Sequence, residues 1–228
     1  FFSVNALWKS EIAVLVGDFL LSRGLLLAVK HEEFALLKIM SAAVQDMSEG
    51  ELLQIEKARK LDITEEVYFD IIRKKTATLI AACCASGANS VGQSKEVVEQ
   101  MRLFGEKAGI AFQIKDDLLD ITGNVDGLGK PTGFDLKKNI LTLPLIHLFE
   151  NMNPVDGKKI RRKLKNHVKK LELKQIRDLI EQHGGIQFAE SQINRLSDEA
   201  YNDLKIFPQS IYKDSLISAL KFNFKRSR

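Results

Sequence analysis

The stretch SKEVVEQMRLFGEKAGIAFQIKDDLLDITG, Ser94–Gly123, predicts one long helix and sets the fold class. Its apolar residues return every three or four positions, and Gly123 supplies an end. Gly105 and Gly109 lie inside this pattern, where the absence of a side chain favours close packing against a neighbouring helix. The apolar positions that carry the periodicity are Val97, Met101, Phe104, Ala108, Ala111, Phe112, Leu118 and Leu119.

The chain upstream of this helix also predicts long helices, because all four prolines lie beyond residue 130. Ile12–Leu27 and Leu36–Lys60 repeat apolar residues at helical spacing and are expected to be core helices. Thr64 is a capping hydroxyl ahead of two glutamates, and the helix it begins is expected to run to Cys84 and stop at Gly87.

The chain downstream begins with a glycine-rich loop, residues 123–133, whose only cation is Lys130. Further helical patterns follow Pro144, with breaks at Gly184-Gly185 and Pro208. No segment alternates β-branched residues for long enough to form a sheet. The predicted class is therefore all-α, a bundle of helices.

Composition bounds the class of protein. The 228 residues are 45% hydrophobic and 28% charged, which is typical of a globular chain and excludes wholesale disorder. Lys and Arg exceed Asp and Glu by 34 − 30 = 4, too few to indicate a nucleic-acid partner. The absence of repeats and of a linker favours a single domain over 1–228.

Two local features indicate a cytoplasmic protein. The only cysteines, Cys83 and Cys84, are adjacent and cannot close a loop as in secreted scaffolds, which indicates a reducing compartment. Ile12–Val29 is the most apolar stretch, but Asp18 and Arg23 interrupt it, so a buried helix is expected in place of a membrane span.

The segment Phe112–Asp120 is the strongest candidate for chemistry. Gln113, Asp116 and Asp120 share one helix face and Asp117 lies to one side. Crowded carboxylates repel one another unless a cation neutralises them, and oxygen ligands of this kind suit Mg²⁺. The residues alone also fit a solvated acidic surface near a helix end, but their apolar neighbours favour a lined cavity.

Cations elsewhere in the chain complement these carboxylates. Lys74, Lys75 and Thr76 interrupt a small, apolar helix surface, and Lys130 lies in the glycine loop. Each lysine alone fits a solvated surface. Together with metal-bridged carboxylates they are what a diphosphate leaving group needs.

Several motifs resemble those of trans-isoprenyl diphosphate synthases. Phe112-Gln-x-x-Asp-Asp-x-x-Asp120 is similar to the second aspartate-rich motif of that family, and Gly129-Lys130-Pro, Asp135 and Thr142-Leu-Pro144 to the loop after it. The resemblance spans essentially the whole chain and is closest to the medium- or long-chain polyprenyl branch. Further segments that carry it are Ser3–Trp8, Val14–Leu21, Glu49–Gln54, Lys75–Leu79 and Asn223–Arg228.

The resemblance implies a large helical bundle around a central cavity, usually a homodimer. It also implies a reaction in which an allylic diphosphate, such as farnesyl diphosphate, ionises with Mg²⁺ assistance and isopentenyl diphosphate attacks the cation. By motif, the implied Mg²⁺ ligands are Asp116, Asp117 and Asp120. The implied diphosphate ligands are Lys75 and Lys130, and Thr76 and Gln113 line the reacting end.

Two departures from the family pattern stand out. The first aspartate-rich motif, in about the first third of the family's length, is expected before Phe1, so this polypeptide alone is expected to be an inactive fragment. Ile140 stands where members typically have a lysine two residues before Thr142. Lys137 or Lys138 is a candidate substitute.

Three alternatives stay open. Ile140 favours a non-catalytic partner subunit with the synthase fold, whereas the intact aspartates favour an enzyme. A short-chain (farnesyl or geranylgeranyl) synthase is compatible with the motifs. A terpene cyclase fits less well, because the Phe112-Gln113 pair and the Lys130 loop resemble those of chain-elongating enzymes.

One charged segment remains outside this scheme. Lys158–Lys170 holds eight Lys or Arg in 13 residues with no acid. A solvated helix surface explains it, and attraction to anionic lipid head groups is the alternative.

Overall fold

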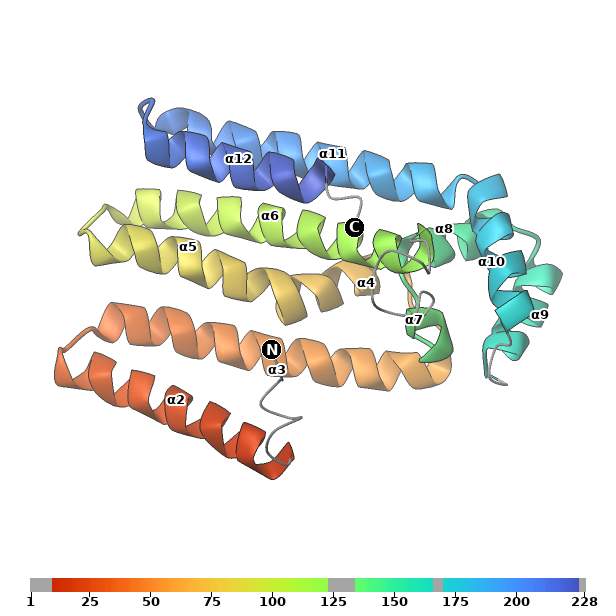
Figure 1. Ribbon diagram of the computed structural model, residues 1–228, viewed down its shortest axis with the longest axis horizontal. Coiled ribbons are helices and arrows are strands. Elements are labelled where there is room, and N and C mark those ends of the chain that lie inside the picture. The colour runs from red at the N-terminus through yellow and green to blue at the C-terminus, as the bar shows by residue number, and fades with distance from the viewer. Residues whose placement is uncertain (1–9, 123–133, 166–169, 226–228) are drawn as a thin grey trace. The chain divides into compact units, whose positions relative to one another are not determined.

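The computed structural model describes residues 10–122, 134–165 and 170–225, and the regular elements among them are all helical (Figure 1). The all-α prediction is confirmed. In chain order the elements are α2 (Ser10–Lys30), α3 (Phe34–Lys60), α4 (Glu65–Ile72), the π-helix η1 (Arg73–Ala77), α5 (Thr78–Ser90), α6 (Lys95–Thr122), α7 (Phe134–Lys137), α8 (Leu143–Asn151), α9 (Pro154–Lys165), α10 (Lys170–Gln182), α11 (Gly185–Asp203), the 3₁₀-helix η2 (Leu204–Ile206) and α12 (Ile211–Lys225).

The chain divides into two compact units, Phe1–Ala42 and Ala43–Arg228. The described part of the first unit is α2 and the start of α3. The expectation that α2 is a buried core helix is wrong, because its large apolar side chains are exposed, as Leu20 (63%) and Leu26 (70%) show. Within this unit the start of α3 can cover one side of α2 at most, so the other apolar sides of α2 stay exposed. The single-domain assignment stays a prediction.

One helix among the described residues, Glu11–Lys30, has the length and apolar composition to cross a membrane, and none of it is buried within the structure. The core helix of a soluble protein and a signal sequence near the N-terminus can have the same length and apolar composition. These two properties alone therefore assign no membrane role to the helix.

The long helices of the second unit begin where their capping residues predict. The Thr64 hydroxyl accepts a hydrogen bond from the Val67 amide at 3.3 Å, and the Ser94 hydroxyl accepts one from Val97 at 3.4 Å. Each cap satisfies an amide that the first helical turn leaves without a backbone partner. Pro144 lies in the first turn of α8, where its missing N–H costs nothing.

Close packing at the two glycines of α6 is confirmed. A Cβ at Gly105 would lie 2.8 Å from the Ala81 Cα, and one at Gly109 would lie 2.6 Å from the Ala77 Cα. Only glycine allows this approach, so α6 runs directly against η1 and α5 (Figure 1). The other flank of α6 packs on α11.

The predicted helix from residue 65 to 84 is helical throughout, but it is not one regular α-helix. A π-helical segment, η1, separates α4 from α5. The expected stop at Gly87 is wrong: α5 continues to Ser90, and Gly92, with φ +70°, follows the end. Gly87 has open space around its Cα and is tolerated inside the helix.

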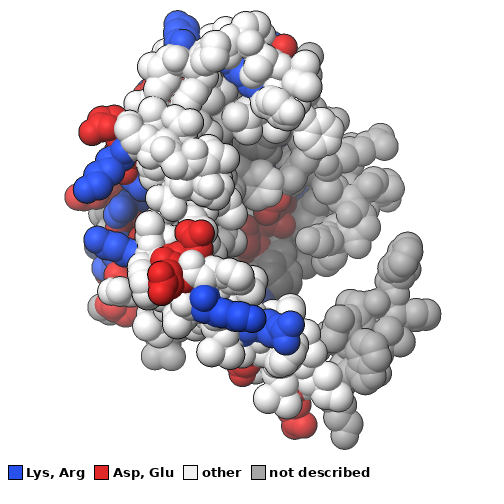
Figure 2. All heavy atoms as spheres, turned by 90° about the vertical axis from the view of Figure 1, so that its left-hand side faces the viewer, with Lys and Arg blue, Asp and Glu red and all other residues white. Residues whose placement is uncertain are grey.

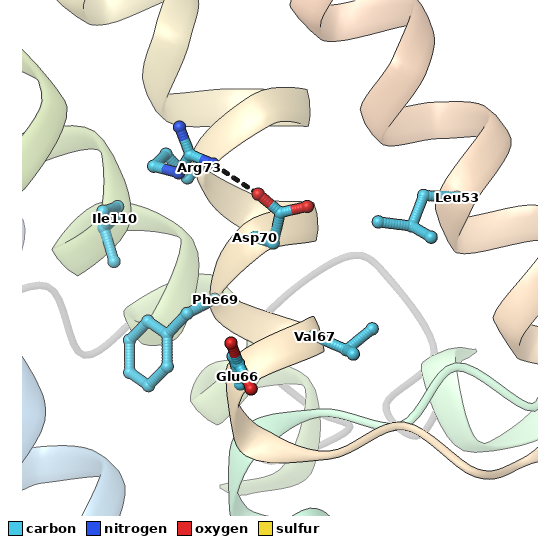
Figure 3. Close-up of a pocket in the computed structure, with 7 residues that line it drawn as sticks. All are labelled: Leu53, Glu66, Val67, Phe69, Asp70, Arg73 and Ile110. Atoms are coloured by element: carbon cyan, nitrogen blue, oxygen red, sulfur yellow. Dashed lines mark hydrogen bonds and ion pairs between the residues drawn. The ribbon is translucent and has the colours of Figure 1, made fainter.

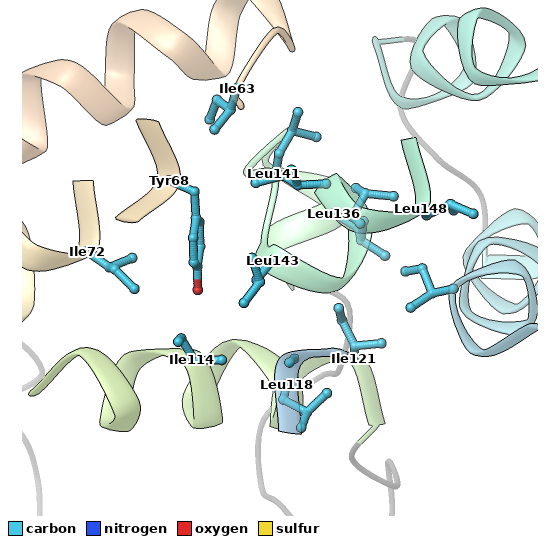
Figure 4. Close-up of a cluster of buried hydrophobic side chains, with 14 of the residues drawn as sticks. Ile63, Tyr68, Ile72, Ile114, Leu118, Ile121, Leu136, Leu141, Leu143 and Leu148 are labelled. Atoms are coloured by element: carbon cyan, nitrogen blue, oxygen red, sulfur yellow. The ribbon is translucent and has the colours of Figure 1, made fainter. Parts of the chain in front are cut away.

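The main core of the second unit lies between α4, α6, α8, α10 and α11. Figure 4 shows its branched aliphatic side chains converging from several helices, with Tyr68 among them. Buried side chains from α6 and α8 lie beside its ring, including Ile114 and Leu143, both 0% exposed (Figure 4). This core fixes α4 against the end of α6 that carries the aspartates.

Candidate active site

The π-helical segment η1 carries two of the predicted site residues, Lys75 and Thr76. Segments of this kind are rare and recur at functional sites. A Cβ at Gly50 of α3 would lie 2.7 Å from the Lys75 backbone nitrogen, so α3 packs directly on η1. The Lys75 ammonium therefore reaches α3, where it lies 2.8 Å from a Glu51 carboxylate oxygen and donates to Gln54 Oε1 at 2.9 Å.

The three aspartates of α6 lie in different environments. Asp116 is exposed, Asp120 is half-buried, and Asp117 is 7% exposed. Asp120 Oδ2 accepts a hydrogen bond from the backbone nitrogen of Asp135, on α7, at 3.1 Å. A fourth carboxylate is thereby drawn to the same end of α6.

A chain of three side-chain hydrogen bonds joins η1, α6 and α4. The Thr76 hydroxyl donates to Gln113 Oε1 at 2.8 Å, and Gln113 Nε2 donates to Asp117 Oδ1 at 2.8 Å. The Tyr68 hydroxyl donates to the other Asp117 oxygen, Oδ2, at 2.7 Å. Figure 4 shows this hydroxyl turned from α4 towards α6. Both oxygens of the buried Asp117 carboxylate thus have donors.

Crowding of carboxylates shapes the electrostatics of the site. Burial raises the pKa of Asp117 to about 7, hydrogen bonds from Gln113 and Tyr68 oppose the rise, and the charges of Asp135 and Asp116 add to it. Burial also raises the pKa of Asp135 to about 6, helped by Asp120 and Asp116, while Lys75 and Lys138 lower it. Carboxylates that raise one another's pKa favour a cation or a protonated partner.

These groups share one cavity of about 290 Å³. It is lined by the predicted residues Lys75, Thr76, Gln113, Asp116 and Asp117, brought together from η1 and α6. Its other lining residues are Glu51, Gln54, Ile63, Tyr68, Ile71, Ile72, Asp135, Lys138, Ile140 and Leu141. The cavity combines an apolar wall with an acidic and a basic edge.

Not every predicted residue lines the cavity: Asp120 is not among the lining residues and contacts the backbone of one of them, Asp135. Lys130 and the glycine loop lie outside the described residues. Lys138 and Ile140 both line the cavity, and the Lys137 side chain lies outside the part of the chain that the structure describes. In the described ranges no group of three or more His, Cys, Asp or Glu side chains is arranged to hold a metal ion, consistent with the inward orientation of Asp117.

Among the polar lining residues, Tyr68, Glu51 and Gln54 were not predicted as site residues from the sequence. Tyr68 lies on a face of α4 that is otherwise apolar, and a buried tyrosine hydroxyl requires a partner. That requirement is the available signal, although it does not identify Asp117. Glu51 carries no such signal because it is exposed on α3.

A second pocket, of about 600 Å³, lies on another face of α4 and holds none of the predicted site residues (Figure 3). Asp70 and Arg73 form an ion pair at its edge, with Phe69 and Val67 on either side of the helix. Leu53 and Ile110 approach from α3 and α6.

A third pocket, of about 690 Å³ and largely apolar, lies between α5, α6 and α12. It is at the end of the second unit where α11 leads into α12, and Figure 2 shows mostly uncharged side chains over the upper part of that end. Cys83, Met101, Phe207 and Leu216 are among its lining residues. It also contains none of the predicted site residues.

The fold and the cavity define a class of helical proteins that bind a ligand with a charged end and an apolar end. The acidic and basic side chains of the cavity fit a diphosphate with its metal ion, and the apolar wall fits a hydrocarbon chain. The polyprenyl synthetase family model matches residues 2–181, and the chain belongs to this family. The similar proteins of known activity are prenyl diphosphate synthases, which are trans-prenyltransferases. The predicted family and enzyme class are therefore confirmed.

Individual relatives place the chain in the medium- or long-chain branch. An all-trans-nonaprenyl-diphosphate synthase (geranyl-diphosphate specific) of Rhodobacter capsulatus is 34% identical over 98% of this chain and 68% of its own length. The crystal structure of a decaprenyl diphosphate synthase from the same organism has a TM-score of 0.90 and 30% identity, over 98% of this chain and 69% of its own. A polyprenyl synthase from Caulobacter crescentus, solved with calcium and isoprenyl diphosphate, has a TM-score of 0.89 and 31% identity over 98% and 69%.

Proposed function

We propose that this chain contributes the active-site residues of its cavity to a Mg²⁺-dependent polyprenyl diphosphate synthase. The enzyme joins isopentenyl diphosphate to an allylic diphosphate such as farnesyl diphosphate. The observation that carries the proposal is the cavity in which Lys75, Thr76 and Gln113 meet Asp116, Asp117 and Asp135. The Caulobacter crescentus structure, which contains a divalent cation and isoprenyl diphosphate, supports it.

The proposed reaction breaks the allylic C–O bond and forms a C–C bond. The diphosphate leaves with the bonding electrons, the double bond of isopentenyl diphosphate attacks the allylic carbon, and a proton is lost from the adduct. The next double bond forms from the electrons of that C–H bond. The product is an allylic diphosphate longer by one five-carbon unit, and inorganic diphosphate is released.

Lys75 is the proposed ligand of the diphosphate oxygens on the basic edge, together with Lys130 of the glycine loop. Its ammonium is already oriented by Glu51 and Gln54, so its geometry is fixed before substrate arrives. Lys138, on the rim of the cavity, is the proposed substitute for the lysine that Ile140 replaces.

Thr76 and Gln113 are proposed to line the reacting end. The Thr76 hydroxyl donates its hydrogen bond to Gln113. Its oxygen lone pairs are therefore available to a group in the cavity. Lone pairs near an allylic carbon favour positive charge there. The apolar wall, with Ile72 and Leu141, keeps water from the cation.

The residues present fit Mg²⁺ by the chemistry of their donors. Mg²⁺ takes one or two carboxylates and completes its shell with water and substrate phosphate. Asp116, Asp117 and Asp120 are the proposed ligand set, and the mutual rise in carboxylate pKa near Asp135 is what a bound cation relieves. When bound, Mg²⁺ neutralises charge on the departing diphosphate.

The test is an elongation assay on the full-length natural polypeptide with Mg²⁺, farnesyl diphosphate and labelled isopentenyl diphosphate. We expect labelled products longer than the primer, with turnover lost in EDTA and restored by Mg²⁺. Product length distinguishes a long-chain from a short-chain synthase. A folded protein that yields no elongated product, but stimulates an active relative, would establish the partner-subunit alternative that Ile140 favours.

We also propose a homodimer in the cytoplasm. The exposed apolar side chains of α2, such as Phe19 at 61%, support a covering partner, and Cys83 and Cys84 are unpaired thiols. Light scattering after gel filtration, with twice the chain mass expected, tests the dimer. Leu20→Lys should shift the protein towards the monomer, since a buried charge is costly.

A transient contact with anionic membrane surfaces is proposed through Lys158–Lys170. In its described part, α9, the buried residues Ile160 and Leu164 face inward, while Lys158, Arg162 and Lys163 are exposed. Flotation with vesicles of phosphatidylcholine, with and without phosphatidylglycerol, tests it. Binding should need the anionic lipid and weaken with salt, and binding that survives neutralisation of these three residues would refute it.

A further inference from the structure

Tyr68 is a buried polar residue for which the proposed chemistry has no direct use. It is 3% exposed, and its hydroxyl donates to Asp117 Oδ2 at 2.7 Å across 49 residues of sequence. We propose that Tyr68 is a positioning residue. It holds the Asp117 carboxylate and, through it, fixes the orientation of the Gln113 amide and the Thr76 hydroxyl in the cavity. This inference rests on the proposed function.

The direction of each hydrogen bond follows from the chemistry of the groups. The Tyr68 hydroxyl and the Gln113 Nε2 group both donate to the Asp117 carboxylate, the first to Oδ2 and the second to Oδ1. Gln113 must then turn its NH₂ group towards Asp117 Oδ1, which leaves its oxygen for Thr76. Thr76 therefore donates its only proton to Gln113 and presents lone pairs elsewhere.

Tyr68 makes this arrangement the favoured one. Its hydrogen bond to Oδ2 holds the carboxylate in the rotation that turns Oδ1 towards Gln113, and each oxygen keeps a second lone pair. Without that donor, the carboxylate can rotate and accept from the amide through either oxygen. The Gln113 oxygen then loses its fixed position, and the Thr76 proton can point into the cavity, where it would repel a developing cation.

The ring and the hydroxyl of Tyr68 have separable roles. The ring packs edge-on against Phe69, with centroids 5.6 Å apart, and fills the core beside Ile114 and Leu143 (Figure 4). A phenylalanine would fill the same volume. Packing therefore does not account for the hydroxyl, and Tyr68→Phe removes the hydrogen bond while preserving the core.

The test compares Tyr68→Phe with Tyr201→Phe, a matched loss of hydroxyl from an exposed tyrosine at 45%. In ¹⁵N-glutamine-labelled protein, the side-chain amide signals of Gln113 should move in Tyr68→Phe and stay unchanged in Tyr201→Phe. The thermal midpoint of Tyr68→Phe should fall by about 2–4 °C. This readout needs no substrate or metal ion.

Kinetics on the full-length polypeptide supply the second readout. We expect kcat of Tyr68→Phe to fall about tenfold, with KM for both diphosphates within about twofold, since misorientation affects the reacting end more than binding. In a Gln113→Leu background, Tyr68→Phe should lower kcat by less than about twofold, because the two residues act in series.

Two results would overturn the proposal. One is Gln113 amide signals that do not move in Tyr68→Phe, and the other is a full tenfold loss that persists in the Gln113→Leu background. A wild-type protein that elongates no primer would instead refute the proposed function. The amide signals would then still decide whether Tyr68 orients Gln113.

Discussion

Two faces of the helix formed by α4 and η1 carry charged residues of the same kinds but hold them differently. On the face shown in Figure 3, Asp70 and Arg73 pair with each other one turn apart. Lys74 lies between the two systems, 3.5 Å from Asp70 and 3.4 Å from Glu49 of α3. On the cavity face, Lys75 reaches across to α3, and the carboxylates of α6 and α7 crowd together.

The contrast separates structural from functional charge. Local pairs on one helix neutralise each other whatever the rest of the fold does, and they are screened by water. The cavity face brings like charges together from distant parts of the sequence, which a stable fold avoids unless a ligand compensates. Arg73, which pairs within its own helix, and Lys75, which reaches α3, therefore belong to different systems although they are two residues apart.

The largest expected effect is a loss of enzyme activity that occurs on substitution at the cavity face and not at the face in Figure 3. Lys75→Ala removes the proposed diphosphate ligand and should lower kcat/KM about 10²- to 10³-fold, as loss of a charge-stabilising donor does. Arg73→Ala, two residues away on the other face, should stay within about twofold of wild type. Steady-state elongation assays measure both, and equal losses in the two variants would contradict the division between the faces.

A middle-sized effect is expected where α3 meets η1. A Cβ added by Gly50→Ala would lie 2.7 Å from the Lys75 nitrogen and 2.8 Å from the Lys74 Cβ, so backbone must move at a cost of about 1–3 kcal/mol in unfolding free energy. Urea unfolding measures it. Gly87→Ala is the matched control: that helical glycine has open space, and the variant should gain about 0.5–1 kcal/mol.

The smallest effect is expected from the ion pair on the face in Figure 3. Asp70→Asn should lower the unfolding free energy by about 0.2–1 kcal/mol, because the side chains of Arg73 and Asp70 are 45% and 32% exposed and screened by solvent. The difference from wild type should shrink in high salt. A loss well above this range that ignores salt would mean that Asp70 has a buried role.

The helices and most of the site were predictable because their signals are local. Thr64 and Ser94 predict where helices begin. Gly105 and Gly109 predict that α6 packs closely against a neighbouring helix. The crowded aspartates of α6, with their apolar neighbours, favour a cation site, which stays a prediction.

The missed features depend on distant partners. Tyr68 acquires its role only where α4 meets Asp117, 49 residues on. The exposure of α2 depends on what packs around it, because apolar periodicity predicts a helix but not its cover. The π-helical segment also escaped prediction, since Arg73–Ala77 reads as a continuation of the α-helical pattern.

That π-helical segment holds about one residue more than an α-helix would need for the same rotation. An α-helix turns by about 100° per residue, and a π-helix turns by less. Deleting one residue within Arg73–Ala77 would therefore let the segment return to α-helical winding with α5 close to its present orientation about the helix axis. Ala81 would still face Gly105 and Tyr68 would stay in the core. Such a deletion would preserve the helix packing and change the side chains that the segment presents to the cavity.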